Sequence, residues 1–164
     1  MLEIIGVIVA VVIVAVAAIG VVFYVGMRRR SPAVLGAVRR FSRTVVNPRM
    51  LKTAGAPGAY ASLVLNAGRR TGREYRTPVV AAPTADGFVI ALPYGTTSNW
   101  VRNVLANGSA TLVHEGATYR VDRPEIVPLG PMNDHFPEKE RRSHIRFRVE
   151  QCVRLRRIDD PEDP

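Results

Sequence analysis

The sequence has little cysteine and histidine. It contains one Cys and three His among 164 residues, and His114, His135 and His144 are scattered without the spacing of metal ligands. A disulfide-stabilised scaffold and a Cys-based zinc site are therefore excluded, and no metal site is expected. The lone Cys152 is compatible with a reducing compartment.

Aromatic residues are scarce, and acidic residues are rare in one part of the chain. Residues 28–78 contain eleven Arg and one Lys against a single acid, Glu74. The few aromatic side chains do not alternate with the Arg residues, as the stacking platforms of a nucleic-acid-binding surface would. Nucleic acid is therefore not expected as a partner, and the positive charge favours anionic lipid headgroups or an acidic small molecule.

The N-terminal region holds one long apolar run. Residues 4–25 carry no charge, and all of them except Gly6 and Gly20 are apolar. At 1.5 Å per residue, about 20 apolar residues cross a hydrocarbon core of about 30 Å. Only Glu3 precedes the run, unlike the basic start of a signal peptide, and Arg28–Arg30 follow it. The positive-inside rule then predicts a single-pass anchor in the cell membrane with the following domain in the cytoplasm; a buried core helix is the alternative.

The composition predicts four regions. We expect a transmembrane anchor at residues 1–27, a basic juxtamembrane helix and linker at 28–58, a folded domain at 59–158 and an acidic, disordered tail at 159–164. Apolar residues recur at helical spacing over residues 33–46, which predicts an amphipathic helix. This helix either lies along an anionic bilayer or packs its apolar face on the domain.

Residues 59–158 show mainly β-strand patterning. A helix is predicted at 99–106, with Thr96, Thr97 and Ser98 as candidate caps and Asn107-Gly108 as its end. Residues 137–148 fit either a helix or a strand. Short strands are predicted at 60–66, 77–82, 88–92, 109–114, 117–122, 124–127 and 152–158. The fold class is therefore mainly β with α, a small β-barrel decorated by helices.

One segment has the composition of an anion-binding turn. The string N-A-G-R-R-T-G-R-E-Y-R-T-P, residues 66–78, places four Arg around two glycines in a strand-turn-strand. Guanidinium groups and turn N–H groups bind phosphate or carboxylate oxygens. The glycine spacing matches neither a Walker loop nor a Rossmann fingerprint. The alternatives are an anion-binding turn and a solvated basic hairpin facing the membrane.

Two motifs together resemble a known family. The string G-R-R-T-G-R-E-Y-R-T-P-V-V is followed, after 12 intervening residues, by P-Y-G-T-T-S-N-W-V-R-N-V-L-A-N-G, and the pair is similar to the deazaflavin-dependent nitroreductases, which use coenzyme F420. The likeness covers about residues 47–127. It implies a split β-barrel of the flavin-binding type that passes a hydride from reduced coenzyme F420 to a quinone or nitroaromatic acceptor.

The resemblance also implies site residues. Because coenzyme F420 carries a phosphodiester and a polyglutamate tail, the basic turn complements its charge. Tyr94 is the only nearby hydroxyl that we nominate as a catalytic donor, and the loop before Trp100 lacks the basic residue that many relatives have there. The implied cofactor-binding residues are Arg69, Arg70, Thr71, Arg73, Arg76, Pro78, Val79, Val80, Tyr94, Gly95, Thr96, Ser98, Asn99 and Trp100.

Two other functions fit the same residues. A barrel of this kind could bind FMN, whose single phosphate needs fewer positive groups than the turn provides. A barrel without enzymatic activity could bind anionic lipid through its Arg-rich face. The sequence leaves the acceptor and the oligomeric state open.

Overall fold

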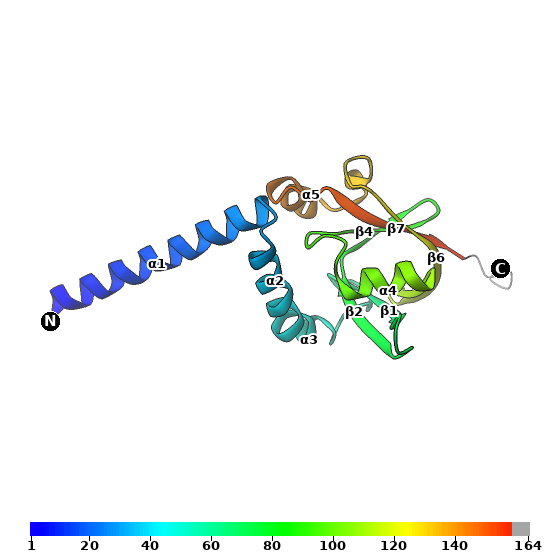
Figure 1. Cartoon of the computed structure of the whole chain (residues 1–164), viewed down its shortest axis with the longest axis horizontal. Coiled ribbons are helices and arrows are strands. Elements are labelled where there is room, and N and C mark those ends of the chain that lie inside the picture. Colours follow the sequence, from blue (N-terminus) through cyan, green and yellow to red (C-terminus); the bar gives the residue numbers. More distant parts are fainter. Residues whose placement is uncertain (159–164) are drawn as a thin grey trace. The chain divides into compact units, whose positions relative to one another are not determined.

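The computed structural model describes residues 1–158 of the chain. The chain forms two compact units, residues 1–39 and residues 40–164, and the elements of each are drawn in Figure 1. The acidic tail predicted at residues 159–164 lies outside the described residues. The boundaries predicted at 27/28 and 58/59 stay predictions.

The first unit contains a long apolar helix. Helix α1 spans Leu2–Arg28, and it is long and apolar enough to cross a membrane; a signal sequence near an N-terminus has the same properties. The chain then turns through Arg30, which has a φ of 52°, and the Ser31 N–H donates to the Gly26 carbonyl at 2.8 Å. Helix α2, Pro32–Phe41, begins with a proline, which lacks only an N–H that the first helical turn leaves unpaired anyway.

The helix predicted at residues 33–46 is longer than expected. After α2 the chain continues as a π-helix, η1, over Ser42–Val46, and then as helix α3 over Asn47–Met50. The predicted end at residue 46 is therefore wrong. Pro48 does not end the helical segment; it stands in the first turn of α3, directly after the π-helix.

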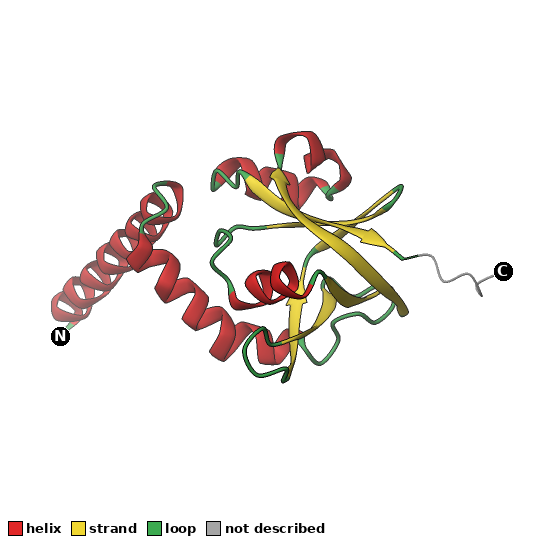
Figure 2. Ribbon diagram, turned by 45° about the vertical axis from the view of Figure 1, so that its right-hand side comes forward, coloured by secondary structure: helices red, strands yellow, loops and turns green. Residues whose placement is uncertain are grey.

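The second unit is built on one antiparallel sheet of seven strands. The order of the strands in the sheet is β2-β1-β5-β6-β7-β4-β3. The strands are β1 Ser62–Ala67, β2 Glu74–Val79, β3 Ala81–Thr84, β4 Gly87–Ala91, β5 Ser109–His114, β6 Ala117–Pro128 and β7 Gln151–Arg157. Figure 2 shows how strongly these strands curve.

Connectivity alone requires the sheet to curl. Strands β2 and β3 are the two ends of the strand order, yet only Val80 separates them in the chain. The Cα atoms of Val79 and Ala81 are therefore within about 7.6 Å of each other, so the two edges of the sheet meet at Val80. The predicted class, a split β-barrel with helices and an apolar N-terminal helix, is confirmed.

Two strand predictions are wrong in their boundaries. The single strand predicted at 77–82 is the end of β2 and the start of β3, on opposite edges of the sheet. The two strands predicted at 117–122 and 124–127 form one strand, β6, with a register shift between Asp122 and Glu125. Arg123 has a φ of 47° at this irregularity, and a bulge tolerates the missing N–H of Pro124.

The turn and helix signals were more accurate. Strands β5 and β6 pair across Glu115-Gly116, both with positive φ (50° and 81°), as a two-residue hairpin requires. Helix α4, Asn99–Asn107, ends at Gly108 in the left-handed conformation, as predicted. Ser98, one of the three candidate caps, occupies the N-cap position, but its side chain forms no capping hydrogen bond.

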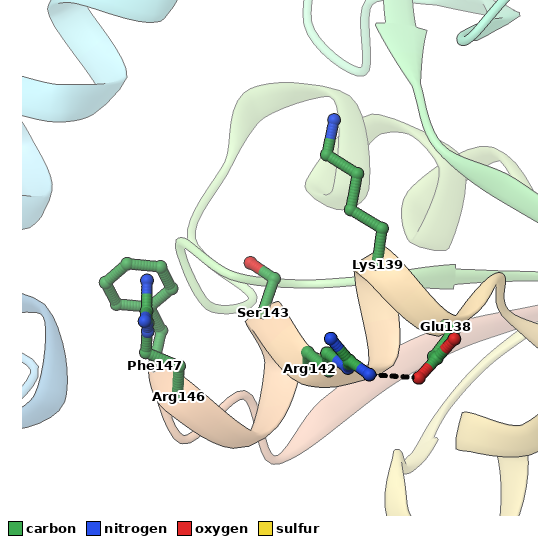
Figure 3. Close-up of a pocket in the computed structure, with 6 residues that line it drawn as sticks. All are labelled: Glu138, Lys139, Arg142, Ser143, Arg146 and Phe147. Atoms are coloured by element: carbon green, nitrogen blue, oxygen red, sulfur yellow. Dashed lines mark hydrogen bonds and ion pairs between the residues drawn. The ribbon is translucent and has the colours of Figure 1, made fainter.

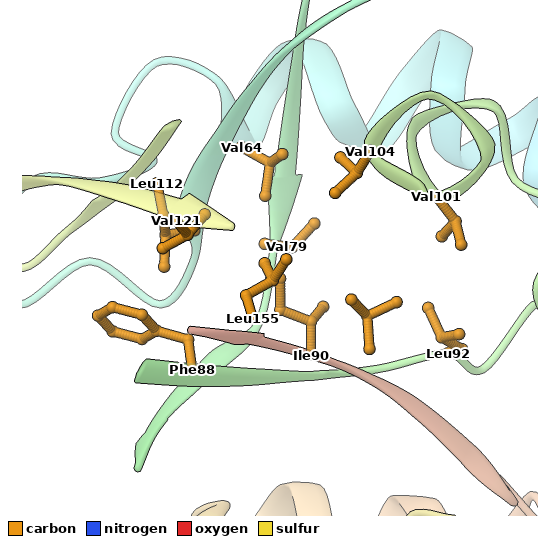
Figure 4. Packing of buried hydrophobic residues seen from close by; sticks show 11 residues of the cluster. Val64, Val79, Phe88, Ile90, Leu92, Val101, Val104, Leu112, Val121 and Leu155 are labelled. Carbon is orange, nitrogen blue, oxygen red and sulfur yellow. The ribbon is translucent and has the colours of Figure 1, made fainter. Parts of the chain in front are cut away.

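Two clusters of buried side chains stabilise the barrel. The larger one joins residues of β1, β2, β4, β5, β6 and β7 to Val101 and Val104 of α4 (Figure 4). The smaller one contains Leu129, Phe136 and Cys152. It lies beside the 3-10 helix η2, Gly130–His135, which the sequence did not reveal, and helix α5, Glu138–Arg146. The ambiguous segment 137–148 is therefore helical over most of its length.

Candidate functional site

The turn between β1 and β2 is held by its own main chain. The Gly68 N–H donates to the Arg73 carbonyl at 2.7 Å, and the Gly72 N–H donates to the Gly68 carbonyl at 2.8 Å. Gly72 has a φ of 66°, which favours glycine. A Cβ on Gly68 would lie 2.7 Å from the ring of Tyr75, so a larger residue there would displace the aromatic side chain. The turn is thus a defined conformation.

Three Arg residues lie in this turn, and a fourth, Arg76, lies on β2. Arg69, Arg70, Arg73 and Arg76 are all exposed, and no ion pair joins any of them to a carboxylate within residues 1–158. The hydroxyl of Thr71 accepts a long hydrogen bond from the Arg73 N–H, at 3.4 Å. The turn therefore presents several guanidinium groups to solvent without internal neutralisation. Such groups bind phosphate and carboxylate oxygens well.

Asn103 fixes one of these guanidinium groups. Its Oδ1 accepts a hydrogen bond from Arg69 Nη1 at 2.9 Å and another from the Arg69 main-chain N–H at 3.3 Å. Asn103 is 4% exposed and lies on α4. Asn99 precedes it by four residues and so lies on the same face of the helix, one turn nearer the N-terminus. The two motifs of the sequence therefore meet at Arg69 and α4.

Two further asparagines lie at the end of β1. Asn107 of α4 donates from Nδ2 to the Ala67 carbonyl at 2.7 Å. Asn66 is 4% exposed, and its Oδ1 has no hydrogen-bond partner among the described residues. A buried carbonyl oxygen without a partner is uncommon and marks a place where a donor is missing. This end of the barrel therefore carries amide side chains as well as guanidinium groups.

The residues expected to line the ring of the cofactor face different directions. Pro78 and Val79 of β2 pair with Leu63 and Ser62 of β1. Because side chains alternate along a strand, Pro78 and Val79 lie on opposite faces of the sheet. Val79 packs in the larger buried cluster, and Val80 packs against the smaller one. Pro78 and Val79 are both buried and Val80 is half-buried, so these three side chains do not form one exposed surface.

The second motif forms the loop after β4 and the start of α4. The Gly95 N–H donates to the Leu92 carbonyl at 3.0 Å, and Gly95 has a φ of 75°. Thr96 and Ser98 are half-buried, and Asn99 is exposed. Trp100 packs against the larger cluster, so part of its ring belongs to the core.

Tyr94 contacts a residue that the sequence analysis did not select. Its hydroxyl lies 3.2 Å from the Ser42 hydroxyl of η1, in hydrogen-bond distance, and both side chains are half-buried. Tyr94 is also close enough to Tyr60 to influence it electrostatically. Loss of hydration, the hydrogen bond from its hydroxyl to Glu140 Oε1 (2.7 Å), and the charges of Glu140 and Tyr94 raise the pKa of Tyr60.

A surface cavity of about 480 Å³ runs along α5. Figure 3 shows Lys139 and Ser143 projecting from one side of this helix, and Arg142 paired with Glu138. The cavity is lined by Glu138, Lys139, Arg142, Ser143, Arg146 and Phe147. The Lys139 ammonium lies 5.6 Å from the centre of the Tyr60 ring, which connects this basic helix to the surroundings of Tyr94.

The remaining titratable groups indicate structural roles. Burial raises the pKa of the Cys152 thiol to about 11, so it stays protonated and unreactive near neutral pH. Burial lowers the pKa of His144, whose Nδ1 lies 2.8 Å from Asn133 Oδ1. No cluster of three or more His, Cys, Asp or Glu that could bind a metal occurs among the residues that the structure describes.

Several solved structures are similar to this chain, and two of them are named here. One is an F420 reductase, with 13% sequence identity and a TM-score of 0.43, covering 60% of this chain and 86% of that one. The other is HutZ, the heme storage protein from Vibrio cholerae, with 10% identity and a TM-score of 0.45, covering 69% of this chain and 90% of that one. No family model and no curated protein matches the chain.

Two residues of this site have no signal in the local sequence. Asn103 occurs in the middle of a helix, where a polar residue is usually solvated, and only the approach of Arg69 reveals its role. Ser42 lies 52 residues before Tyr94, and no local pattern connects them.

Proposed function

We propose that the chain is a membrane-anchored oxidoreductase that uses reduced coenzyme F420 to reduce a quinone or nitroaromatic acceptor. The observation that carries the proposal is the turn between β1 and β2, with four exposed Arg side chains in it and on β2, no internal ion pair within the described residues, and Arg69 fixed by Asn103. We infer that coenzyme F420 is the anion bound there because the two sequence motifs resemble the deazaflavin-dependent family.

The donor set fits the charged part of that cofactor. Coenzyme F420 carries phosphodiester and carboxylate oxygens, which guanidinium groups bind in pairs of hydrogen bonds. Arg69, Arg70 and Thr71 would hold these oxygens, with Arg73 and Arg76 adding positive charge. Pro78 and the main chain of Val79 and Val80 would support the ring, and the loop residues Tyr94, Gly95, Thr96 and Ser98 with Asn99 and Trp100 of α4 would enclose it.

The proposed reaction requires few reactive side chains from the protein. When bound, the reduced deazaflavin supplies a hydride. The chain binds and orients the reactants, excludes water, and donates a proton to the acceptor, for which Tyr94 is the candidate. Cys152 and His144 are buried away from such a role.

We place the proposed activity at the cytoplasmic face of the cell membrane because of the apolar helix α1. An α1 helix that spans the cell membrane once, with the domain on the cytoplasmic side, would hold the barrel near acceptors dissolved in the lipid. Exposed Arg side chains follow it, among them Arg29, Arg40 and Arg43, and such groups favour the anionic cytoplasmic leaflet.

Equilibrium titration tests the proposal and separates it from its alternatives. The full chain, in detergent micelles, is titrated with coenzyme F420, with FMN and with a short-chain anionic phospholipid. Micromolar binding of F420, a free energy of about −8 kcal/mol, is expected, with much weaker binding of FMN. Tighter binding of FMN supports the flavin alternative. Saturable binding of the anionic phospholipid, without affinity for either cofactor, supports the lipid-binding alternative.

A further inference from the structure

Ser42 differs from the other hydroxyl residue of the π-helix. The Thr44 hydroxyl donates to the carbonyls of Arg40 and Phe41, at 3.0 and 3.4 Å, within its own helical segment. The Ser42 hydroxyl instead lies 3.2 Å from the hydroxyl of Tyr94, on the loop between β4 and α4. One member of the segment therefore contributes to helix structure, and the other contacts the candidate proton donor.

Ser42 lies where the helical segment changes from α to π. A stretch of π-helix widens the turn and rotates the residues relative to a continuous α-helix. It begins at Ser42, directly after α2 ends at Phe41. π-helical turns are less stable than α-helical turns and occur often at functional sites. In this chain the irregularity coincides with the residue that reaches Tyr94.

A second hydrogen bond lies close enough to Tyr94 to be influenced by its charge. Tyr60, whose pKa Tyr94 helps to raise, donates to Glu140 at 2.7 Å, and Lys139 lies over its ring. Ser42, Tyr94, Tyr60 and Glu140 come from η1, the loop after β4, the segment before β1, and α5. Four separate segments thus bring hydroxyl and carboxylate groups together, which packing alone does not require.

We propose that Ser42 is a positioning residue that orients Tyr94 as the proton donor to a carbonyl, quinone or nitro oxygen of the acceptor. This inference rests on the proposed function. A phenol has one proton and accepts hydrogen bonds through its lone pairs. With Ser42 as the donor in the pair, the Tyr94 proton stays available to the acceptor.

The acceptor takes up one hydride and one proton. The O–H bond of Tyr94 breaks and an O–H bond forms on the acceptor, which also receives the hydride, one hydrogen nucleus with two electrons, supplied by the reduced cofactor. The resulting phenolate accepts the Ser42 hydrogen bond, which strengthens because one partner is charged. Water then returns a proton to Tyr94. Ser42 thereby lowers the energy of the charged state.

The test uses the full chain with a readout that does not need the cofactor. Tyrosine labelled with ¹³C at Cζ reports the ionisation of each phenol by NMR, and Tyr94→Phe identifies the Tyr94 signal. In Ser42→Ala, the midpoint of the Tyr94 titration should move to higher pH, because its phenolate loses a donor. Ser42→Thr should restore the wild-type midpoint. Thr44→Val, which removes the other hydroxyl of the π-helix, is the matched control and should leave it unchanged.

The same variants are then compared in single-turnover oxidation of bound, reduced F420 by menadione. Tyr94→Phe should slow this step about 100-fold, and Ser42→Ala about 10-fold, with F420 affinity unchanged. Equal midpoints and equal rates in Ser42→Ala and Thr44→Val would overturn the role of Ser42 while leaving the proposed function intact. Absence of F420 oxidation in the wild type would contradict the proposed function, and the NMR titration would still decide whether the pair exists.

Discussion

The carboxamide oxygen of Asn103 accepts both hydrogen bonds that hold Arg69 against α4, one from its guanidinium at 2.9 Å and one from its main chain at 3.3 Å. Two sequence motifs about 30 residues apart thereby form one surface. A guanidinium held in place loses less conformational entropy on binding an anion than one that is free to rotate.

We therefore predict that Asn103→Ala weakens F420 binding about 10-fold. It should also lower the free energy of unfolding by about 1–3 kcal/mol, because the Arg69 N–H loses a buried acceptor. Fluorescence titration and urea denaturation measure the two effects. Arg102→Ala, which removes an exposed side chain from the neighbouring position of the same helix, is the control. Equal affinities of the two variants would show that Asn103 does not organise the site.

The basic turn should dominate the affinity and make it depend on salt. The double variant Arg69→Ala, Arg70→Ala should bind F420 about 10- to 100-fold more weakly than the wild type, and its affinity should change less as ionic strength rises. Calorimetry at low and high salt measures both. The variant Arg102→Ala, Arg120→Ala removes the same charge at exposed positions outside the turn. If that variant loses as much affinity, the effect is one of net charge and the turn is not the site.

Local signals in the sequence located much of this fold. Glu115-Gly116 and Asn107-Gly108 marked a hairpin and a helix end because positive φ restricts the residues that can occupy such positions. Val80 gave no such signal. The residues around it form an unbroken apolar run, and only the pairing of distant strands determines that the chain passes there from one edge of the sheet to the other.

The site was predictable in part for the same reason. Arg69 and Arg70 stand in a glycine-bounded turn, which is a local feature. Asn103 and Ser42 take their roles from partners 34 and 52 residues away, so no window of sequence contains the information. The helix at 138–146 was ambiguous in the sequence because Ile145, Phe147 and Val149 alternate with polar residues, as in a strand. In the structure Ile145 lies on α5 and is 72% exposed, so this alternation does not reflect burial.

The buried His144 should make stability depend on pH. Burial lowers its pKa in the folded state below the ordinary value of 6.5, with Glu140 acting weakly in the opposite direction. The unfolded chain therefore takes up a proton that the folded protein resists, so the free energy of unfolding should fall as pH drops through 6.5 towards the lowered value. Above about pH 7.5 this contribution is constant, because His144 is neutral in both states.

Urea denaturation of the wild type and of two variants, His144→Gln and His135→Gln, between pH 8 and pH 5 measures this dependence. The His144→Gln variant should lose that part of the slope, whereas His135→Gln, at an exposed position, should keep it. A slope that is the same in both variants would assign the dependence to other groups.

The barrel interior should be sensitive to loss of volume. Ile90 is 1% exposed within the larger buried cluster, so Ile90→Ala should lower the free energy of unfolding by about 2–5 kcal/mol. The same substitution at Ile145, which is 72% exposed, should change it by less than about 0.5 kcal/mol. Comparable losses at the two positions would contradict the assignment of the core.

Membrane anchoring predicts a specific behaviour of the N-terminal helix. The full chain expressed in bacteria should stay in the membrane pellet after alkaline extraction, and its intact mass should include residues 1–27. A soluble chain shortened at its N-terminus would instead identify the segment as a cleaved signal sequence.

Single-turnover oxidation of reduced F420 tests the central claim most directly. The full chain is loaded with the reduced cofactor in detergent micelles and mixed with menadione, and the return of the absorbance of the oxidised deazaflavin is followed by stopped flow. The account predicts a rise that is much faster with the wild type than without protein, and strongly reduced in the Arg69→Ala, Arg70→Ala variant. A rate equal to that without protein, in the presence of enough wild-type chain to bind all of the cofactor, would contradict it.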